Sequence, residues 1–468
     1  MVHFFFSPHG RWEEEGGPVI SLLATVIWLF FICAVGWVIC RLLDPERALS
    51  WPLYCGSAFG LGAGAVAFAM FFCDIMTGRL YAFGVTVFLA LVCLASWFFF
   101  LRRGNATQAM RVFPRVGRFR PAEIAILIVI MFYVVHVVVM TITQPIMGWD
   151  AVSYIAFNGK VLFHERTLSY LSNMPHADYP LLIPLLQSWL AMQIGVWHEY
   201  LLKAVMPAYF ISFGFIVFGF LRFFVSRFFA LFGVLFLFSA PGLRDHAAGN
   251  YMDLPLMYYF SGAVLLAVLS LSGKGKKYAL LSALLLTGAV WTKLEGGRYA
   301  LLMIPLLLIA YFFKRRRTRQ SFLAQSAVYS VPLFFFFGWQ GYIFFRGIEV
   351  RTDTRFFWPA DLFIRLHKLV PHAVNVMGEI HLWGLAWWML LLALLAGWRK
   401  LSFPANMLLI GIGVFHASLF GGLIFTSSFK YLFPVDVVLP RLMLHGYPLI
   451  PVSAVILLAR VCSESRSV

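Results

Sequence analysis

The sequence predicts an all-α protein that crosses a lipid bilayer many times, with about 13 transmembrane helices and additional juxtamembrane helices on the periplasmic side. Hydrophobic residues make up 61% of its 468 residues and charged residues only 12%, whereas a soluble domain is nearer half apolar and a quarter charged. The mean hydropathy is +0.84. Apolar segments that approach the ~30 Å of a bilayer core recur along the whole chain.

Fourteen apolar segments are candidate membrane spans. They fall at about 18–40, 52–73, 80–101, 121–143, 181–197, 202–221, 228–241, 254–272, 278–292, 299–313, 321–345, 382–397, 403–425 and 443–460. In the second span, the "GLGAG" of residues 60–64 indicates close helix packing. Six cysteines without a CxxC pair argue against a disulfide framework or a thiolate metal site.

The net charge of +17 comes from 37 basic and 20 acidic residues. The basic residues cluster between apolar segments, which is typical of positive-inside sorting and not of nucleic-acid binding. The two most basic loops, 102–120 and 314–319, should both face the cytoplasm. An even number of spans must therefore separate them, yet seven candidates lie between them. The short segment 181–197, with Pro184 inside it, is the one we expect not to cross. Thirteen spans then place the N-terminus outside and the C-terminus inside.

This topology places the polar stretch 144–186 on the outer, extracytoplasmic face of a plasma (inner) membrane. From Asp150 onward the spacing predicts an amphipathic helix in the interface, with its polar face toward a cavity. The predicted apolar side holds Ala151, Val152, Ile155, Ala156, Leu162 and Phe163, and the polar side holds Asp150, Ser153, Tyr154, Asn158, Lys160, His164 and Glu165. Asp150 stands out because a carboxylate at a membrane boundary commonly has a function.

Four motifs follow one another in order: "GWDAVSYIAFNGKVLF", "HADYPLLIPLL", "GNYMDLPLMYYF" and "WTKLEGG". Their order resembles that of membrane-embedded GT-C glycosyltransferases that use polyprenyl-phosphate sugars, such as protein O-mannosyltransferases and lipid A aminoarabinose transferases. The resemblance covers roughly residues 121–313 and implies a donor sugar on a polyprenyl phosphate and a lipid, glycan or protein acceptor.

The resemblance implies that Asp150 is the general base and that 181–197 is a juxtamembrane helix. It also assigns the binding of the acceptor or a metal to Asp178 and Asp253. The lysine or histidine of the family's proline motif is missing from "DYPLL", and His176 lies two residues before Asp178. An attack opposite the phosphate would invert the anomeric centre.

Cationic side chains near the outer ends of later spans are candidates for binding the donor phosphate. They are Lys293, Arg298, Lys430 and Arg441, with Arg351, Arg355 and His445 as further candidates. Lys293 has an equally good alternative, a structural ion pair with Glu295. Asp253 has one too, because it could cap the helix that begins at Leu254 and Pro255. A divalent metal ion held by Asp178, Asp253 and His367, His372 or His381 is a further hypothesis.

Three regions are expected. Residues 1–120 form an N-terminal extension of three helices. Residues 121–320 form a catalytic core with the first outer loop at 144–200. Residues 321–468 form C-terminal helices with outer loops at 346–381 and 426–442. Two other functions remain open on the sequence alone: a transporter or flippase for lipid-linked or small substrates, and a polysaccharide polymerase or ligase.

Overall fold

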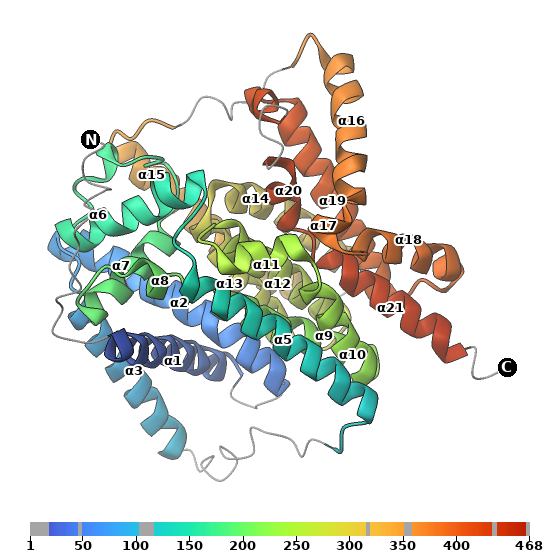
Figure 1. Ribbon diagram of the computed structural model, residues 1–468, viewed down its shortest axis with the longest axis horizontal. Helices are drawn as coiled ribbons and strands as arrows, with labels where there is room; N and C mark the ends of the chain where they lie inside the picture. The colour runs from blue at the N-terminus through green and yellow to red at the C-terminus, as the bar shows by residue number, and fades with distance from the viewer. Residues whose placement is uncertain are drawn as a thin grey trace.

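The computed structural model describes residues 18–44, 49–102, 117–314, 319–350, 358–432 and 438–464. These residues fold into helices joined by short connections, as the sequence predicts (Figure 1). Proline and glycine mark several of the helix boundaries. Pro52 and Pro121 lie in the first turns of their helices, where the missing N–H is not needed. Gly78 and Gly195 end helices with φ of 70° and 90°, a backbone conformation that favours glycine.

Nine helices of the described chain are long and apolar enough to cross a membrane, and two bent helix pairs raise the number to as many as eleven. The nine comprise α1 (Pro18–Leu43), α2 (Trp51–Thr77), α3 (Ala82–Arg102), α5 (Pro121–Thr143), α8 with α9 (Glu199–Leu202 and Val205–Leu221), α12 (Asp253–Leu271), α14 (Leu294–Lys314), α15 (Arg319–Phe345) and α19 (Phe403–Ile424). The bent pairs are α10 (Arg227–Phe238) with α11 (Pro241–Ala248), and α20 (Val438–Leu444) with α21 (Leu449–Glu464).

Two of the thirteen predicted spans fall on shorter helices, α13 (Lys276–Thr292) and α18 (Ala386–Gly397), so the count of thirteen stays a prediction. The segment that we expect not to cross forms α7 (Leu182–Ile194), which has 13 residues. At 1.5 Å per residue such a helix spans about 20 Å, which is too short for a bilayer core. The remaining helices are α6 (Phe157–Glu165), α16 (Leu362–Gly378) and α17 (Ile380–Trp383).

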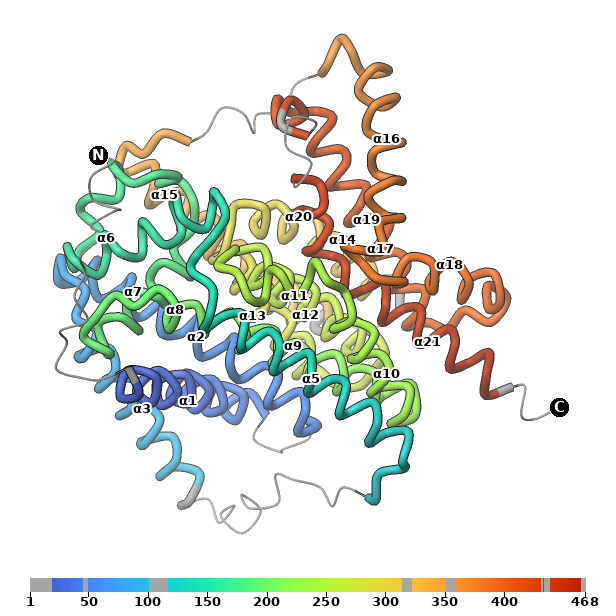
Figure 2. The backbone as a smooth tube through the Cα atoms, viewed as in Figure 1, coloured from blue at the N-terminus to red at the C-terminus, as the bar shows by residue number. Residues whose placement is uncertain are grey.

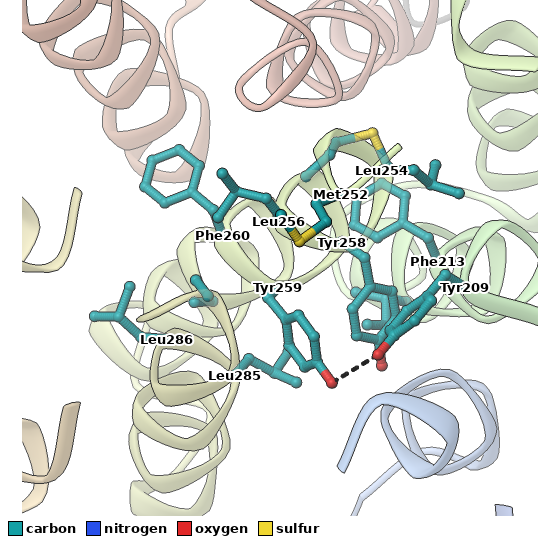
Figure 3. Close-up of a cluster of buried hydrophobic side chains, with 14 of the residues drawn as sticks. Tyr209, Phe213, Met252, Leu254, Leu256, Tyr258, Tyr259, Phe260, Leu285 and Leu286 are labelled. Carbon is teal, nitrogen blue, oxygen red and sulfur yellow. Dashed lines mark hydrogen bonds between the residues drawn. The ribbon is translucent and has the colours of Figure 1, made fainter. Parts of the chain in front are cut away.

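Helix α12 forms the centre of the molecule, and every one of its residues is buried. Two consecutive tyrosines join it to the N-terminal helix α2. The Tyr258 hydroxyl donates to the Gly56 carbonyl and the Tyr259 hydroxyl to the Gly60 carbonyl, each at 2.6 Å. The Tyr259 hydroxyl also lies 3.1 Å from the Tyr209 hydroxyl of α9 (Figure 3). The N-terminal extension is therefore packed into the core of the protein.

Glycines bring α1 and α2 into backbone contact, which confirms the close packing predicted from "GLGAG". A Cβ at Gly62 would overlap the carbonyl oxygen of Ile32, and one at Gly36 would overlap that of Ala58. The N-terminal helices and the C-terminal helices α18 and α21 lie on opposite sides of α12 (Figure 2). Helix α16 projects away from the rest of the molecule (Figure 1).

Candidate active site

Asp253 is the centre of a buried polar cluster. It is the first residue of α12, and its carboxylate is 1% exposed. Lys293 donates to Oδ1 at 2.9 Å, and Nε2 of His445 lies 2.9 Å from the same oxygen. The N-cap of α12 is Met252, with no side-chain cap bond, and the bonds of the Asp253 carboxylate go to Lys293, Arg441 and His445, so the helix-cap interpretation is wrong. The carboxylate instead joins side chains from the end of α13 and the C-terminal segment.

Arg441 connects Asp253 to Asp150. Its Nη2 atom lies 2.9 Å from Oδ2 of Asp253 and 2.6 Å from Oδ2 of Asp150. A second hydrogen bond, from Nε to Oδ2 of Asp253, is 3.2 Å long. The two carboxylates differ in environment, because that of Asp150 is 27% exposed. Asp150 and Asp253 therefore share one guanidinium.

Lys293 lies in the break between α13 and α14 and is 5% exposed. Besides its bond to Asp253, it forms a longer ion pair with Glu295 at 3.6 Å. Glu295 is also within electrostatic range of Arg298. Lys293 is thus part of a structural ion pair, as the alternative interpretation held, but its closer partner is Asp253 and not Glu295. Whether it also binds a phosphate stays a prediction.

His445 is buried and bonded at both ring nitrogens. Nδ1 lies 2.9 Å from the Tyr299 hydroxyl and Nε2 lies next to Asp253. An ionised carboxylate can only accept a hydrogen bond, so Nε2 carries the proton and Nδ1 accepts from Tyr299. The Ser261 hydroxyl donates to the backbone carbonyl of His445 at 2.7 Å. These bonds fix the segment between α20 and α21 against α12 and α14.

Asp150 precedes a π-helical turn, η3 (Ala151–Ala156), which continues into α6. Tight packing positions its backbone: Gly148 has φ of 96°, and a Cβ there would overlap the Tyr251 hydroxyl. The ring of Tyr251 in turn lies 4.6 Å from the Arg441 guanidinium. π-Helical turns such as η3 are frequent at functional sites.

The predicted polar face of this segment is only partly confirmed. Tyr154 and Asn158, which we expected to face a cavity, are buried in the protein. The Asn158 amide donates to the Pro175 carbonyl at 2.9 Å, and the Tyr154 ring packs on His176 and Tyr179. The π-helical turn explains the difference, because it changes the angular spacing on which the prediction depended.

Tyr154 forms an aromatic wall next to the charged cluster. Burial raises the pKa of its hydroxyl well above its ordinary value, and Tyr179, Asp150 and Asp253 act in the same direction. Tyr154 is therefore a neutral hydroxyl at physiological pH. Tyr179 is within electrostatic range of Lys293 as well. The segment "HADYPLLIPLL" thus contributes Tyr179 and His176 to the surroundings of the site.

The structure also places the other predicted residues. Asp178 is buried, and its backbone carbonyl accepts a hydrogen bond from Trp339. Lys160 of α6 is half-buried, and Lys430 is exposed in the turn after α19. Arg351 and Arg355 fall outside the described residues.

A metal centre does not form from the predicted ligands. Within the described part of the chain, no three histidine, cysteine or acidic side chains come close enough to hold a metal ion. His367 and His381 are exposed, and His372 is half-buried in α16. His381 pairs with Glu379 at 3.2 Å. The hypothesis that one of them joins Asp178 and Asp253 is therefore not supported by the geometry.

His246 of α11 is a site residue that the sequence reasoning missed. Its Nδ1 lies 2.8 Å from the Gly242 carbonyl, so Nδ1 carries the proton and the neutral ring has a free lone pair on Nε2. Nε2 is shielded from solvent and has no hydrogen-bond partner in the described structure. Its ring lies 5.3 Å from that of Tyr251, and Asp253 and Arg441 are within electrostatic range. The local sequence "LRDHAA" matches no functional motif, so the sequence alone did not indicate this histidine.

No family model and no curated protein matches this chain. Among solved structures, it is similar to the crystal structure of ArnT from Cupriavidus metallidurans bound to undecaprenyl phosphate. The two chains are 17% identical, with a TM-score of 0.49. The likeness covers 72% of this chain and 60% of ArnT, so this chain spans less than two thirds of that protein.

Proposed function

We propose that this protein is a membrane glycosyltransferase that moves a sugar from a polyprenyl-phosphate donor to an acceptor hydroxyl on the outer face of the membrane. The observation that carries the proposal is the Asp150–Arg441–Asp253 arrangement. It pairs a partly exposed carboxylate, suited to take a proton, with a guanidinium suited to bind a phosphate. The order of motifs between Asp150 and Lys293 supports the same chemistry.

The two carboxylates have separate roles in this proposal. Asp253 is buried and held by Lys293, His445 and Arg441, so it orients the cationic groups. Asp150 is the more exposed of the two and has a single ion-pair partner, Arg441, in the described structure. A donor phosphate that approaches Arg441 competes with Asp150, the carboxylate that is easier to displace. Binding of the donor then frees the base.

The transfer step follows from these positions. The oxygen of the acceptor hydroxyl attacks the anomeric carbon of the sugar, and Asp150 takes the hydroxyl proton. The bond from the anomeric carbon to the phosphate oxygen breaks, and its electron pair leaves with the polyprenyl phosphate. Arg441 stabilises the charge that develops on that phosphate. Attack from the side opposite the phosphate would invert the anomeric centre.

An apolar groove next to the cluster is suited to the hydrocarbon part of the donor. It lies between α12, α14 and α19, with Val264, Leu306 and Gly411 among its lining residues. Tyr299 also lines the groove, and its hydroxyl bonds His445. A lipid chain in this groove would therefore have its phosphate close to the Asp253 cluster.

Mass spectrometry of lipids that co-purify in mild detergent tests the proposal. We expect Asp150→Asn to fold normally, to retain a polyprenyl phosphate sugar and to lower the transfer rate by about 10²–10⁴, the usual contribution of a general base. Asp361→Asn is the control, because Asp361 is 47% exposed and, like Asp150, pairs with an arginine, Arg365, at 2.9 Å. Wild-type turnover in Asp150→Asn would remove Asp150 as the base. Absence of any such lipid from both proteins would favour the transporter alternative.

A further inference from the structure

A second cavity lies where the N-terminal extension meets the first outer loop. Two hydrogen bonds join the last turn of α2 and the turn that follows it to the segment after α6. The Leu80 amide donates to the Arg166 carbonyl at 2.7 Å, and the Leu168 amide donates to the buried carboxylate of Asp74 at 3.0 Å. The two segments therefore form one fixed structure at the outer end of α2.

The cavity between them has a volume of about 810 Å³. Residues 78–84 line one side, and Glu165, Arg166, Thr167, Ser169 and Tyr170 line the other. This volume is within the usual range of small-molecule sites. None of the Asp253 cluster residues lines it, so it is distinct from the candidate active site.

Arg79, Arg166 and Glu165 are the charged residues of the cavity, and all three are exposed. In the part of the chain that the structure describes, neither guanidinium has an ion-pair partner. The cavity therefore has one positive charge in excess, carried by groups with five N–H donors each. Such groups bind phosphates and carboxylates with two parallel hydrogen bonds.

Arg166 has an unfavourable backbone conformation for a side chain of its size. It ends α6 with φ of 52° and ψ of 34°, the left-handed region in which glycine or asparagine is usual. The Leu80 hydrogen bond to its carbonyl holds it there. A glycine would adopt this conformation without strain, so the arginine at this position is explained better by its side chain than by the turn.

The surroundings of the cavity indicate an amphiphilic ligand. Its edge coincides with the start of α3, a candidate membrane span. Tyr81, Phe83 and Tyr170 line the cavity and have exposed rings. Aromatic rings of this kind gather where a membrane meets water. A ligand here would meet arginines at the polar end and aromatic rings toward the bilayer.

We propose that this cavity is a binding site for a phosphate or carboxylate headgroup, carried by a lipid that enters from the outer leaflet. The assignment does not depend on the transferase proposal, because it concerns binding and not transfer. It gives the N-terminal extension a function, which is to complete this site together with the first outer loop.

Native mass spectrometry of the full-length protein, titrated with short-chain phosphatidylglycerol and with phosphatidylcholine, tests the site. We expect wild type to prefer phosphatidylglycerol and Arg79→Gln/Arg166→Gly to lose at least tenfold in its affinity. The glycine relieves the backbone strain, so this variant separates loss of binding from loss of folding. Arg222→Gln/Arg399→Gln, which removes two exposed arginines outside the cavity, is the matched control and should bind as wild type does.

Soluble glycerol phosphate in the same titration distinguishes the sources of the headgroup. Glycerol phosphate could displace the lipid at a concentration equal to that of the lipid, in wild type but not in the double variant. This result would support an anion-binding site and would assign a soluble ligand to it. Equal affinity of wild type and the double variant for phosphatidylglycerol would overturn the proposal. Equal binding of the neutral and the anionic lipid by wild type would overturn it as well.

Discussion

Replacement of Asp253 by asparagine tests whether this carboxylate holds the cluster together. Asparagine keeps the volume of the side chain but removes its charge. Lys293 is 5% exposed and would retain only the 3.6 Å pair with Glu295, and Arg441 would retain only Asp150. Breaking a buried ion pair by removing one partner typically costs about 3–5 kcal/mol. Because both cations keep one carboxylate, we expect Asp253→Asn to lower the free energy of unfolding by about 3 kcal/mol, the lower end of that range.

A double-mutant cycle with Lys293→Met measures the coupling between the two buried charges. Asp253→Asn/Lys293→Met removes both members of the pair. We therefore expect its loss in the free energy of unfolding to be about 2 kcal/mol smaller than the sum of the losses in the two single variants. Unfolding of the purified protein in mixed micelles by added sodium dodecyl sulfate, followed by tryptophan fluorescence, gives the free energies. Asp150→Asn is the comparison, with an expected loss below about 1 kcal/mol because its pair is partly exposed.

Three results would contradict this reasoning. If Asp253→Asn were as stable as wild type, the cluster would not depend on the buried carboxylate. If the two substitutions were additive, Asp253 and Lys293 would not interact in the folded protein. A loss in Asp150→Asn as large as that in Asp253→Asn would contradict the separate roles proposed for the two carboxylates.

Three further predictions concern other parts of the molecule. Gly411→Phe fills the apolar groove and should lower the amount of co-purified lipid severalfold by mass spectrometry, whereas Gly413→Phe, outside the groove, should not. His246→Asn keeps a donor for the Gly242 carbonyl but removes Nε2, the buried nitrogen near Asp253 and Arg441 that has no partner among the described residues, and should lower kcat/KM about tenfold in initial-rate transfer assays. His416→Asn is its control, because His416 has the same bond to a carbonyl four residues earlier but packs among aromatic rings. Gly62→Val should separate α1 from α2 and cost about 1–3 kcal/mol in the same unfolding assay.

The membrane fold was largely accessible from the sequence, because hydropathy and charge act locally. Counting basic loops singled out 181–197, and the structure has only the short helix α7 there. The two bent pairs were harder to predict. A break such as that between α10 and α11, where the helices meet at 69°, looks like one span followed by a loop when only composition is considered.

The site was only partly accessible, since its contacts join distant parts of the chain. Asp253 and Arg441 are 188 residues apart, and the sequence could place them on one face of the membrane but not in contact. Tyr251 and Tyr299 gave no signal, because tyrosines are common in apolar helices. The cap interpretation of Asp253 was reasonable locally, given the proline two residues later, and failed because three distant side chains bind the carboxylate.

In the proposed reaction, the charges of the cluster couple the binding of the donor to the release of the base. Asp150 and Asp253 both bind Arg441, so a phosphate that approaches this guanidinium meets a cation that already has two carboxylate partners. One of the two carboxylates must therefore leave Arg441 when the phosphate binds. Two opposite charges 4 Å apart attract by about 4 kcal/mol at an effective dielectric constant of 20, and the single negative charge of a sugar phosphodiester offers Arg441 a comparable attraction. In the proposed reaction, binding of the phosphate therefore replaces one attraction of Arg441 by another of similar size, and Asp150 is freed when the donor binds.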